Sequence, residues 1–366
     1  MRILNYKTVN NMATKSSNIF DLLGIKTQEN YHSKFICSLI EYDKCAKKEF
    51  LKMLNKEISV VSVDEKKIDE DLKCKARTER TLPDNTGRVD IFISGKFGKN
   101  DDNTRIIIEN KIFASDQHEQ IKRYFEYLDE NDNNDKPKYK GYLFYLTLEG
   151  KDPSQYSLGD LFETNKISKS KVLFVKLSYS NHILPWLKEI KNNIEPPKMK
   201  TYISDYIEIV ENLTRVSEMV EKDEYKEGEG IEKGDYNALL ELRFWQYLLP
   251  EIVKDDDKID KRRYFSYEKI LRMHHEKKKN PRDYGIIVKE GENSYIRIAV
   301  NKNFELYLSK GYFDNDKWVP TEPTEPKITN FRTNDFVNIT KMKEIADEIS
   351  KEFKGMRTKE NKDNNG

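Results

Sequence analysis

Apolar residues recur along the chain in two different periods, which predict where its strands and helices lie. Short runs rich in Ile, Val, Phe and Tyr have the length and alternation of β-strands. Turn-forming residues separate the middle runs, at 83–87 (PDNTG) and 95–103 (GKFGKNDDN). The predicted strands cover residues 58–64, 74–82, 88–95, 104–112, 140–148 and 171–178.

A helical period precedes these strands. Thr27 is a suitable N-cap residue, so a helix is predicted to begin there. Glu29 lies seven residues before Ile36, about two helical turns, and therefore points to the buried side at the open N-terminal end. A simpler interpretation is that Glu29 stabilises this helix terminus through the macrodipole. The buried stripe consists of Tyr31, Phe35, Ile36, Leu39 and Ile40.

Further helices follow among the strands. One is predicted at 116–130, and two more at 181–220 are separated by the prolines of 195–197 (EPP). The order of helix, three antiparallel strands, helix and strand predicts a mixed α/β sheet with helices packed against it. In the helix predicted at 116–130, one face holds Gln117, Ile121, Tyr124, Phe125 and Leu128.

The sequence texture divides the chain into regions. A polar leader is followed by the mixed α/β core, a Glu/Lys/Gly-rich linker or loop, a C-terminal α+β region and a polar tail expected to be disordered. The C-terminal region is predicted to hold helices at 236–253, 264–278 and 338–353 and a strand meander at 283–313. The regional boundaries are 1–17, 18–220, 221–235, 236–355 and 356–366.

The composition is that of a globular protein. Hydrophobic residues make up 37% and charged residues 35% of the 366 positions, and the formal net charge is +1. This balance does not favour a general nucleic-acid coat protein, although an enzyme can still concentrate positive charge locally. The three cysteines have no metal-site spacing and are expected to be reduced thiols. Without an apolar segment of signal-peptide or membrane-span length, the protein is expected to be cytoplasmic and not bound to membranes.

Charged residues embedded in two adjacent apolar strands indicate chemistry. Strand alternation places Asp90 on one face of its strand, and Glu109 and Lys111 on one face of the next. If these strands pair, the two carboxylates lie side by side and repel one another. A divalent cation relieves this repulsion, and oxygen ligands suit Mg²⁺ or Mn²⁺. Lys111 could then orient a water molecule or stabilise charge on a phosphate.

The alternative for Glu109 and Lys111 is a pair of solvated residues on an edge strand, since charged residues usually face water. The surrounding Ile-rich runs and the second carboxylate at Asp90 favour a buried site instead. Metal, carboxylates and an adjacent lysine together are suited to hydrolysing a phosphodiester.

Four motifs in this order resemble the PD-(D/E)XK nuclease superfamily, in particular a bacterial branch with HS, GR(V/I)D, IIIENK and DQ…Q…Y motifs. They are ENYHSKF (29–35), GRVDIFI (87–93), IIIENKI (106–112) and DQHEQIKRY (116–124). The resemblance covers about residues 20–180. It departs from the superfamily pattern at Val89-Asp90, where proline would precede the aspartate. Pro83-Asp84 matches literally, but it lies in a turn, so Asp90 is preferred.

The resemblance implies a restriction-endonuclease-like fold, with a mixed β-sheet core flanked by helices and an α+β extension at the C-terminus. It also implies Mg²⁺, held by Asp90, Glu109 and the carbonyl of Asn110, with Glu29 as a further metal or water ligand. Gln120 and Tyr124 would contact the site or the DNA backbone. On spacing alone, the favoured interpretation of Gln120 and Tyr124 is a surface pair flanking Ile121.

Several basic or polar residues could contact the substrate. Gln117, Lys122 and Arg123 belong to the helix after the site, and 261–283 combines excess Lys and Arg with aromatic residues. A solvated helix face explains 261–283 equally well.

The predicted function is a Mg²⁺-dependent nuclease acting on DNA, with Mn²⁺ able to substitute. The alternatives are a catalytically idle nucleic-acid-binding or assembly module, and a phosphodiesterase acting on RNA or nucleotides. A homodimer would suit cutting of both strands, and phage defence or DNA restriction and repair would be the role of a solitary nuclease of this branch.

Overall fold

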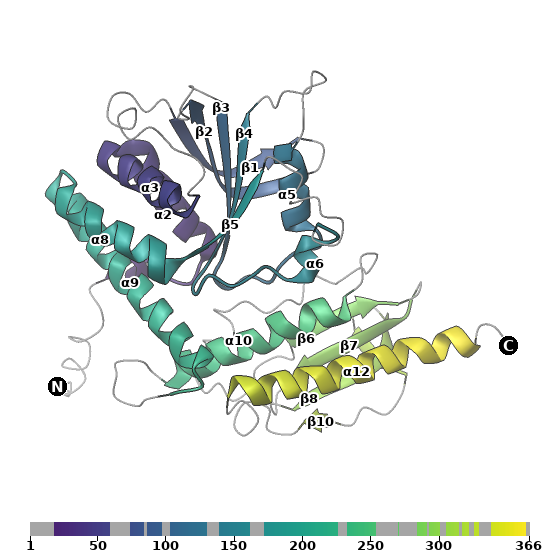
Figure 1. The fold of residues 1–366 in the computed structure, drawn as a ribbon. Coiled ribbons are helices and arrows are strands. Elements are labelled where there is room, and N and C mark those ends of the chain that lie inside the picture. Colours follow the sequence, from purple (N-terminus) through teal and green to yellow (C-terminus); the bar gives the residue numbers. More distant parts are fainter. Residues whose placement is uncertain are drawn as a thin grey trace, which may run out of the picture. The chain divides into compact units, whose positions relative to one another are not determined.

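A computed structural model describes most of the chain (Figure 1). The described residues are 18–58, 74–83, 86–96, 103–129, 139–161, 172–225, 233–253, 270, 284–290, 293–300, 305–314, 317–321, 326–328 and 338–363. The predicted strand at 59–64, the leader 1–17, Asp84 and nearly all of 261–283 lie outside them.

The chain forms two compact units. The first comprises Met1–Asn110, Leu128–Gly150 and Lys171–Leu213. The second comprises Lys111–Tyr127, Lys151–Ser170 and Thr214–Gly366. The two units are described separately below.

The first unit is built on a five-stranded mixed sheet with the order β1-β2-β3-β4-β5. β1 pairs antiparallel with β2 and β2 with β3, whereas β4 and β5 are parallel. The central strands are apolar on both faces, as expected for a sheet that is covered on both sides. The strands are β1 (Cys74–Leu82), β2 (Gly87–Lys96), β3 (Asn103–Lys111), β4 (Lys140–Thr147) and β5 (Leu173–Ser178). The predicted mixed α/β fold class is confirmed.

Helices α2 and α3 pack beside this sheet, and α2 contacts both β1 and β2 (Figure 1). The Asp43 side chain caps α3 by accepting a hydrogen bond from the Ala46 N–H at 2.7 Å. Trp186 fastens α8 to α3, because its indole N–H donates to the Ala46 carbonyl at 3.0 Å. The helical elements are α1 (Ile19–Leu22), α2 (Glu29–Tyr42), α3 (Lys44–Glu57), the π-helical turn η2 (Tyr179–Ile183), α8 (Leu184–Asn193) and α9 (Pro197–Glu221). α9 continues beyond the first unit at Leu213.

The second unit contains another sheet, with the order β10-β8-β7-β6 and β9 paired to β8. Helices α10 and α12 pack against one another alongside it. Its elements are α5 (Gln120–Asp129, whose last two residues belong to the first unit), α6 (Gln155–Leu158), α10 (Lys233–Ile252), β6 (Tyr284–Lys289), β7 (Tyr295–Val300), β8 (Leu306–Asp314), β9 (Lys317–Pro320), β10 (Pro326–Ile328) and α12 (Ile339–Asp363). The predicted strand meander and the helix at 236–253 are present.

Three predicted boundaries differ from the structure. α2 begins at Glu29 and its N-cap position is Gln28, which makes no side-chain cap bond, so Thr27 is not the cap. α5 begins at Gln120 and not at 116, since residues 116 and 117 have no regular secondary structure and 118–119 form a turn. α12 continues to Asp363, into the range expected to be a disordered tail. Lys and Glu are strong helix formers, and Met356 is the only apolar residue among the helical residues 356–363.

None of the helices among the described residues is long and apolar enough to cross a membrane.

Two glycine-to-alanine substitutions in the second unit should differ in their effect on stability, because one glycine lies close to a neighbouring strand and the other has space for a side chain. A Cβ at Gly285 would lie 2.0 Å from the Ile298 carbonyl oxygen, whereas a Cβ at Gly355 in α12 meets nothing within 4 Å. Gly285→Ala should lower the free energy of unfolding by about 1–3 kcal/mol through overpacking. Gly355→Ala should raise it by about 0.5–1 kcal/mol. Urea denaturation followed by tryptophan fluorescence measures both, and equal midpoints would contradict the tight approach of β6 and β7.

Candidate active site

The candidate site lies where β2 and β3 separate. Their last paired residues are Ile91 and Ile108, and the next residues along the two strands are Asp90 and Glu109. Beyond this point the backbone N–H of Asn110 donates to Oδ2 of Asp90 at 2.8 Å. The aspartate side chain therefore supplies an acceptor where the regular strand pairing has ended.

Asp90 and Glu109 face the same side of the sheet. Phe92 and Ile107 are directly paired, so their side chains share a face. Strand alternation places Asp90, two residues before Phe92, and Glu109, two residues after Ile107, on that same face. Asp90 is half-buried, and Glu109 is only 2% exposed.

Lys111 is the last residue of β3 and is 8% exposed. It follows Glu109 by two positions along the same strand, so alternation turns both side chains to one face. Charged side chains are rarely this buried unless they are paired or bind an ion. The interpretation of Glu109 and Lys111 as solvated edge residues is therefore wrong.

Asn110 turns its side chain to the opposite face and joins three elements. It is 0% exposed. Its Nδ2 donates to Oγ of Ser33 on α2 at 3.0 Å, and its Oδ1 accepts from the Tyr179 hydroxyl at 3.1 Å. Together with the hydrogen bond from the Asn110 backbone N–H to the Asp90 carboxylate, these contacts fix the end of β3 relative to α2 and η2.

A second layer of polar groups supports this arrangement. His32 Nε2 lies 2.9 Å from the Lys26 carbonyl and therefore donates to it, which makes Nδ1 the acceptor for the Tyr206 hydroxyl at 3.1 Å. Burial lowers the pKa of His32 to about 4, so the ring is neutral near pH 7. Burial also raises the pKa of both Tyr179 and Tyr206, which remain protonated hydrogen-bond donors.

Glu29 begins α2 and is half-buried. It precedes Ser33 by one helical turn, so both side chains lie on the side of α2 that meets β3. The charge of Glu29 contributes to the raised pKa of Tyr179, which places it near the Asn110 contacts. Its predicted role as a metal or water ligand stays a prediction.

The donor set fits a hard divalent cation. The Asp90 and Glu109 carboxylates and the Asn110 carbonyl offer only oxygen, which suits Mg²⁺ or Mn²⁺. A carboxylate has about four lone-pair positions, so the Asn110 bond does not exhaust Asp90. Within the described residues, no group of three or more His, Cys, Asp or Glu side chains is close enough to hold a metal. Bound water would have to complete such a site, as is usual for Mg²⁺.

Gln120 and Tyr124 form a buried pair in the second unit. They are 3% and 1% exposed, and Gln120 Nε2 donates to the Tyr124 hydroxyl at 3.1 Å. The favoured interpretation of a surface pair is therefore wrong, because spacing shows that the two side chains share a helix face and does not show what covers that face. Contact of either residue with DNA stays a prediction.

The other predicted substrate contacts are Lys122 and Arg123 of α5 and Gln117, which precedes this helix, and their surroundings differ. Lys122 lies between the carboxylates of Glu119 and Asp160, and the hydrogen bond to Glu119 raises its pKa. Arg123 donates to the His118 carbonyl, and Gln117 is exposed. Binding of phosphates by Lys122 would therefore compete with its two acidic neighbours.

Sequence analysis did not identify the supporting roles of His32, Ser33, Tyr179 and Tyr206. The adjacent residues His32 and Ser33 were noted as part of a motif, and this was a usable signal. Their partners lie more than 70 positions away in the chain, at separations of 174 for His32–Tyr206 and 77 for Ser33–Asn110. Local periodicity contains no information about such pairs.

The model of the PD-(D/E)XK nuclease superfamily matches residues 17–208, just over half of the chain. The matched range contains Glu29, Asp90, Glu109, Asn110 and Lys111 together with the four residues that support them. No curated protein and no solved structure gives a significant match to the chain.

Replacing Asn110 should test its role in holding the end of β3. Asn110→Leu keeps the size of the side chain but leaves the Ser33 and Tyr179 hydroxyls without this partner. It should lower the free energy of unfolding by about 2–5 kcal/mol, whereas Tyr179→Phe, which removes one bond, should cost about 1–2 kcal/mol. The exposed Asn193→Leu serves as the control in urea denaturation. Wild-type stability in Asn110→Leu would contradict the anchoring role.

His32 should make stability fall in acid. Its folded-state pKa of about 4 lies below the ordinary value of 6.5, so the unfolded chain binds a proton first as the pH falls. Its contribution is fully present above pH 6.5 and is lost between about pH 6.5 and 4. Between pH 7 and 5, wild type should lose about 2 kcal/mol more than His32→Gln. Parallel pH dependences of the two proteins would show that His32 is not buried in its neutral form.

Proposed function

Because this chain belongs to the PD-(D/E)XK nuclease superfamily, we propose that it is a Mg²⁺-dependent nuclease that hydrolyses phosphodiester bonds of DNA at Asp90, Glu109 and Lys111. The main support is that Glu109 and Lys111 are buried in β3 just beyond Ile108, the last residue of β3 that pairs with β2. A protein with no use for these charges would gain stability from apolar residues at the same positions.

The carboxylates of Asp90 and Glu109 and the carbonyl of Asn110 would hold the cation, and Glu29 would contribute a further ligand or position a water molecule. When bound, Mg²⁺ lowers the pKa of a coordinated water and stabilises negative charge on the phosphoryl oxygens. Mn²⁺ prefers the same oxygen ligands and would substitute.

Lys111 would act on the substrate side. Its ammonium group shares the face of Glu109, so it can donate a hydrogen bond to the attacking water or to a non-bridging phosphate oxygen. Burial of its stem restricts the side chain to few positions, which favours accurate placement of the charge.

The supporting contacts favour a rigid site. The backbone N–H of Asn110 donates a hydrogen bond to the Asp90 carboxylate, and the Asn110 side chain is fixed in turn by hydrogen bonds with Ser33 and Tyr179. Gln120 and Tyr124 are proposed as further contacts to the active site or the DNA backbone, on the basis of the motif that they share with the superfamily branch.

The four motifs favour the bacterial branch with HS, GRVD, IIIENK and DQ…Q…Y sequences. On that basis we propose a cytoplasmic enzyme that forms a homodimer and has a role in phage defence. The C-terminal region from 236 to 355 is proposed as a module for substrate binding or assembly.

Cleavage assays should identify the enzyme and its site. Purified wild type is incubated with circular and linear DNA, single- and double-stranded, and with RNA, in Mg²⁺, Mn²⁺ or EDTA. Cleavage of DNA should require the metal and stop in EDTA. Asp90→Asn and Lys111→Met, which keep the side-chain size, should each reduce the rate at least about a hundredfold.

Asp21→Asn and Lys191→Met are the matched controls, because they remove the same charges from α1 and α8 outside the site. Their rates should equal that of wild type. Cleavage that persists in EDTA would contradict the metal role. A folded wild type that cuts no polymer would favour the idle binding module, and a preference for RNA or nucleotides would favour the alternative phosphodiesterase.

A further inference from the structure

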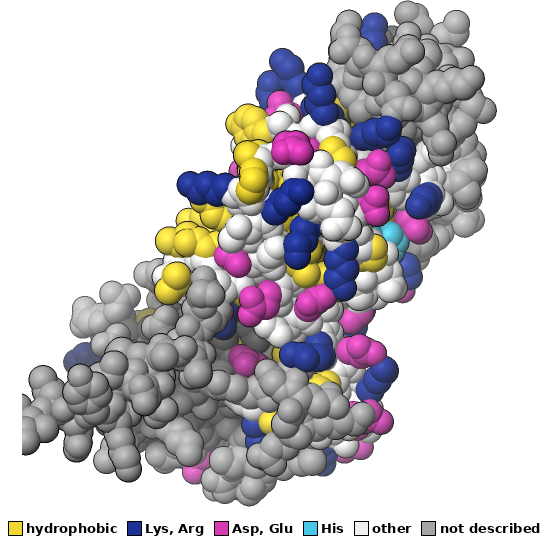
Figure 2. All heavy atoms as spheres, turned by 90° about the vertical axis from the view of Figure 1, so that its left-hand side faces the viewer, with side chains coloured by type: hydrophobic (Ala, Val, Ile, Leu, Met, Phe, Trp, Pro, Cys, Tyr) yellow, Lys and Arg dark blue, Asp and Glu magenta, His cyan; other side chains and the backbone are white. Residues whose placement is uncertain are grey.

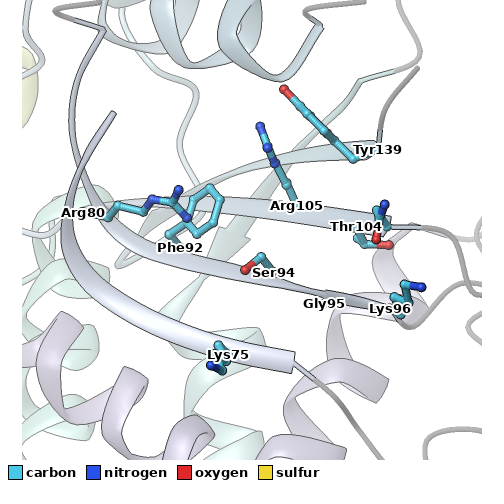
Figure 3. A pocket seen from close by; sticks show the side chains of 10 residues that line it. Lys75, Arg80, Phe92, Ser94, Gly95, Lys96, Thr104, Arg105 and Tyr139 are labelled. Carbon is cyan, nitrogen blue, oxygen red and sulfur yellow. The ribbon is translucent and has the colours of Figure 1, made fainter. Parts of the chain in front are cut away.

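A pocket of about 410 Å³ opens on the first unit (Figure 3). Its walls come from β1, β2 and β3 and from the residue preceding β4. The ten residues that line it are Lys75, Arg80, Phe92, Ser94, Gly95, Lys96, Asn103, Thr104, Arg105 and Tyr139. No function has been assigned to this pocket above.

Among the described residues that line the pocket, every charged side chain is basic. Four of the ten residues are Lys or Arg, and none is Asp or Glu. The chain as a whole has 65 basic and 64 acidic residues, so this separation is not a property of its composition. On the face shown in Figure 2, by contrast, basic and acidic side chains are interspersed.

The pocket shares a sheet face with the candidate active site. Lys75 is directly opposite Ser94, which is directly opposite Arg105, so these side chains form a row across three strands. Phe92 lies two residues before Ser94, and Asp90 two residues before Phe92, which keeps all three on one face. At about 3.3 Å per residue, Ser94 is about 13 Å from Asp90 along β2.

Aromatic rings hold both arginines in place. The Arg80 guanidinium lies 3.9 Å from the centroid of Phe92, and that of Arg105 lies 3.7 Å from the centroid of Tyr139 (Figure 3). Stacking engages the flat face of a guanidinium, whereas phosphate binding uses the N–H groups along its edge. A stacked arginine is therefore oriented before an anion arrives, and less side-chain entropy is lost on binding.

We propose that this pocket binds backbone phosphates of the nucleic-acid substrate, a few nucleotides from the bond that is cut. The inference rests on the proposed nuclease function and adds a second binding site for the same strand. Phosphate contacts position a nucleic acid without reading its bases. The pocket should therefore increase affinity equally for all sequences.

A binding assay tests the pocket without any cleavage. Fluorescence anisotropy with a labelled DNA oligonucleotide is measured in EDTA over a series of salt concentrations, for two unrelated sequences and for single and double strands. The variant Lys75→Gln/Lys96→Gln removes two exposed cations from the rim. Its affinity should fall on the order of tenfold, and the slope of log affinity against log salt should become shallower by about 1.4–1.8.

Two variants serve as controls. Lys56→Gln/Lys198→Gln removes two exposed lysines from α3 and α9 and should bind as wild type does. Lys75→Arg/Lys96→Arg keeps the charge and should also retain affinity and slope. Thermal denaturation of each variant establishes that it is folded.

The outcomes separate this proposal from the proposed function. Affinity that depends on Lys75 and Lys96 in a protein that never cuts would support the pocket and reject the nuclease. Metal-dependent cutting by a protein whose binding ignores Lys75 and Lys96 would reject the pocket alone. Loss of inorganic phosphate or mononucleotide binding in the variant, with normal binding of the oligonucleotide, would also overturn it, since the pocket would then serve a small anion.

Discussion

The hydrogen bond from the Asn110 backbone to the Asp90 carboxylate holds the candidate site together. Strand pairing between β2 and β3 stops at Ile91 and Ile108, and a buried backbone N–H beyond that point needs another acceptor. The Asp90 carboxylate supplies this acceptor at 2.8 Å, and Asp90 itself lies within strand β2. A single carboxylate thus fixes the separation of the strands and offers oxygen to a cation, so its structural and chemical roles cannot be separated by simple truncation.

Alternation along β3 divides the work among three consecutive residues. Glu109 and Lys111 face one side, where charge is useful for the proposed chemistry, and Asn110 faces the other, where it bonds to Ser33 and Tyr179. The neutral amide is suited to that inner face because it can donate and accept at once without carrying a charge into the core. Packing of Tyr206 against His32 then ties the same region to α9 and the start of α2. Precise placement of the charged face depends on this uncharged one.

The sequence was sufficient to predict the mixed sheet and to place Asp90, Glu109 and Lys111 on one sheet face, because period-two alternation and charges within Ile-rich runs are local signals. Their catalytic role stays a prediction. It was insufficient for the partners of Asn110, since Ser33 and Tyr179 are brought to it by folding. The burial of Gln120 and Tyr124 was misjudged for the same reason: spacing shows which residues share a helix face, but not whether that face is covered. The cap of α2 differed by one residue because Gln28 takes the position without making a side-chain bond.

Binding of a polyanion requires positive charge, which the carboxylates of the candidate site cannot supply. Asp90 and Glu109 repel a phosphodiester until a cation neutralises them, so they contribute little to capturing a polyanion from solution. On α5, Lys122 is already paired with Glu119 and Asp160, so binding of a phosphate there would compete with both carboxylates. Among the described residues that line the pocket around Arg80 and Arg105, four are basic and none is acidic, and the pocket lies on the face that Asp90 shares. Under the proposed function, a chain with a net charge of +1 would bind nucleic acid by separating cations for capture, on β1, β2 and β3, from carboxylates for chemistry, on β2 and β3.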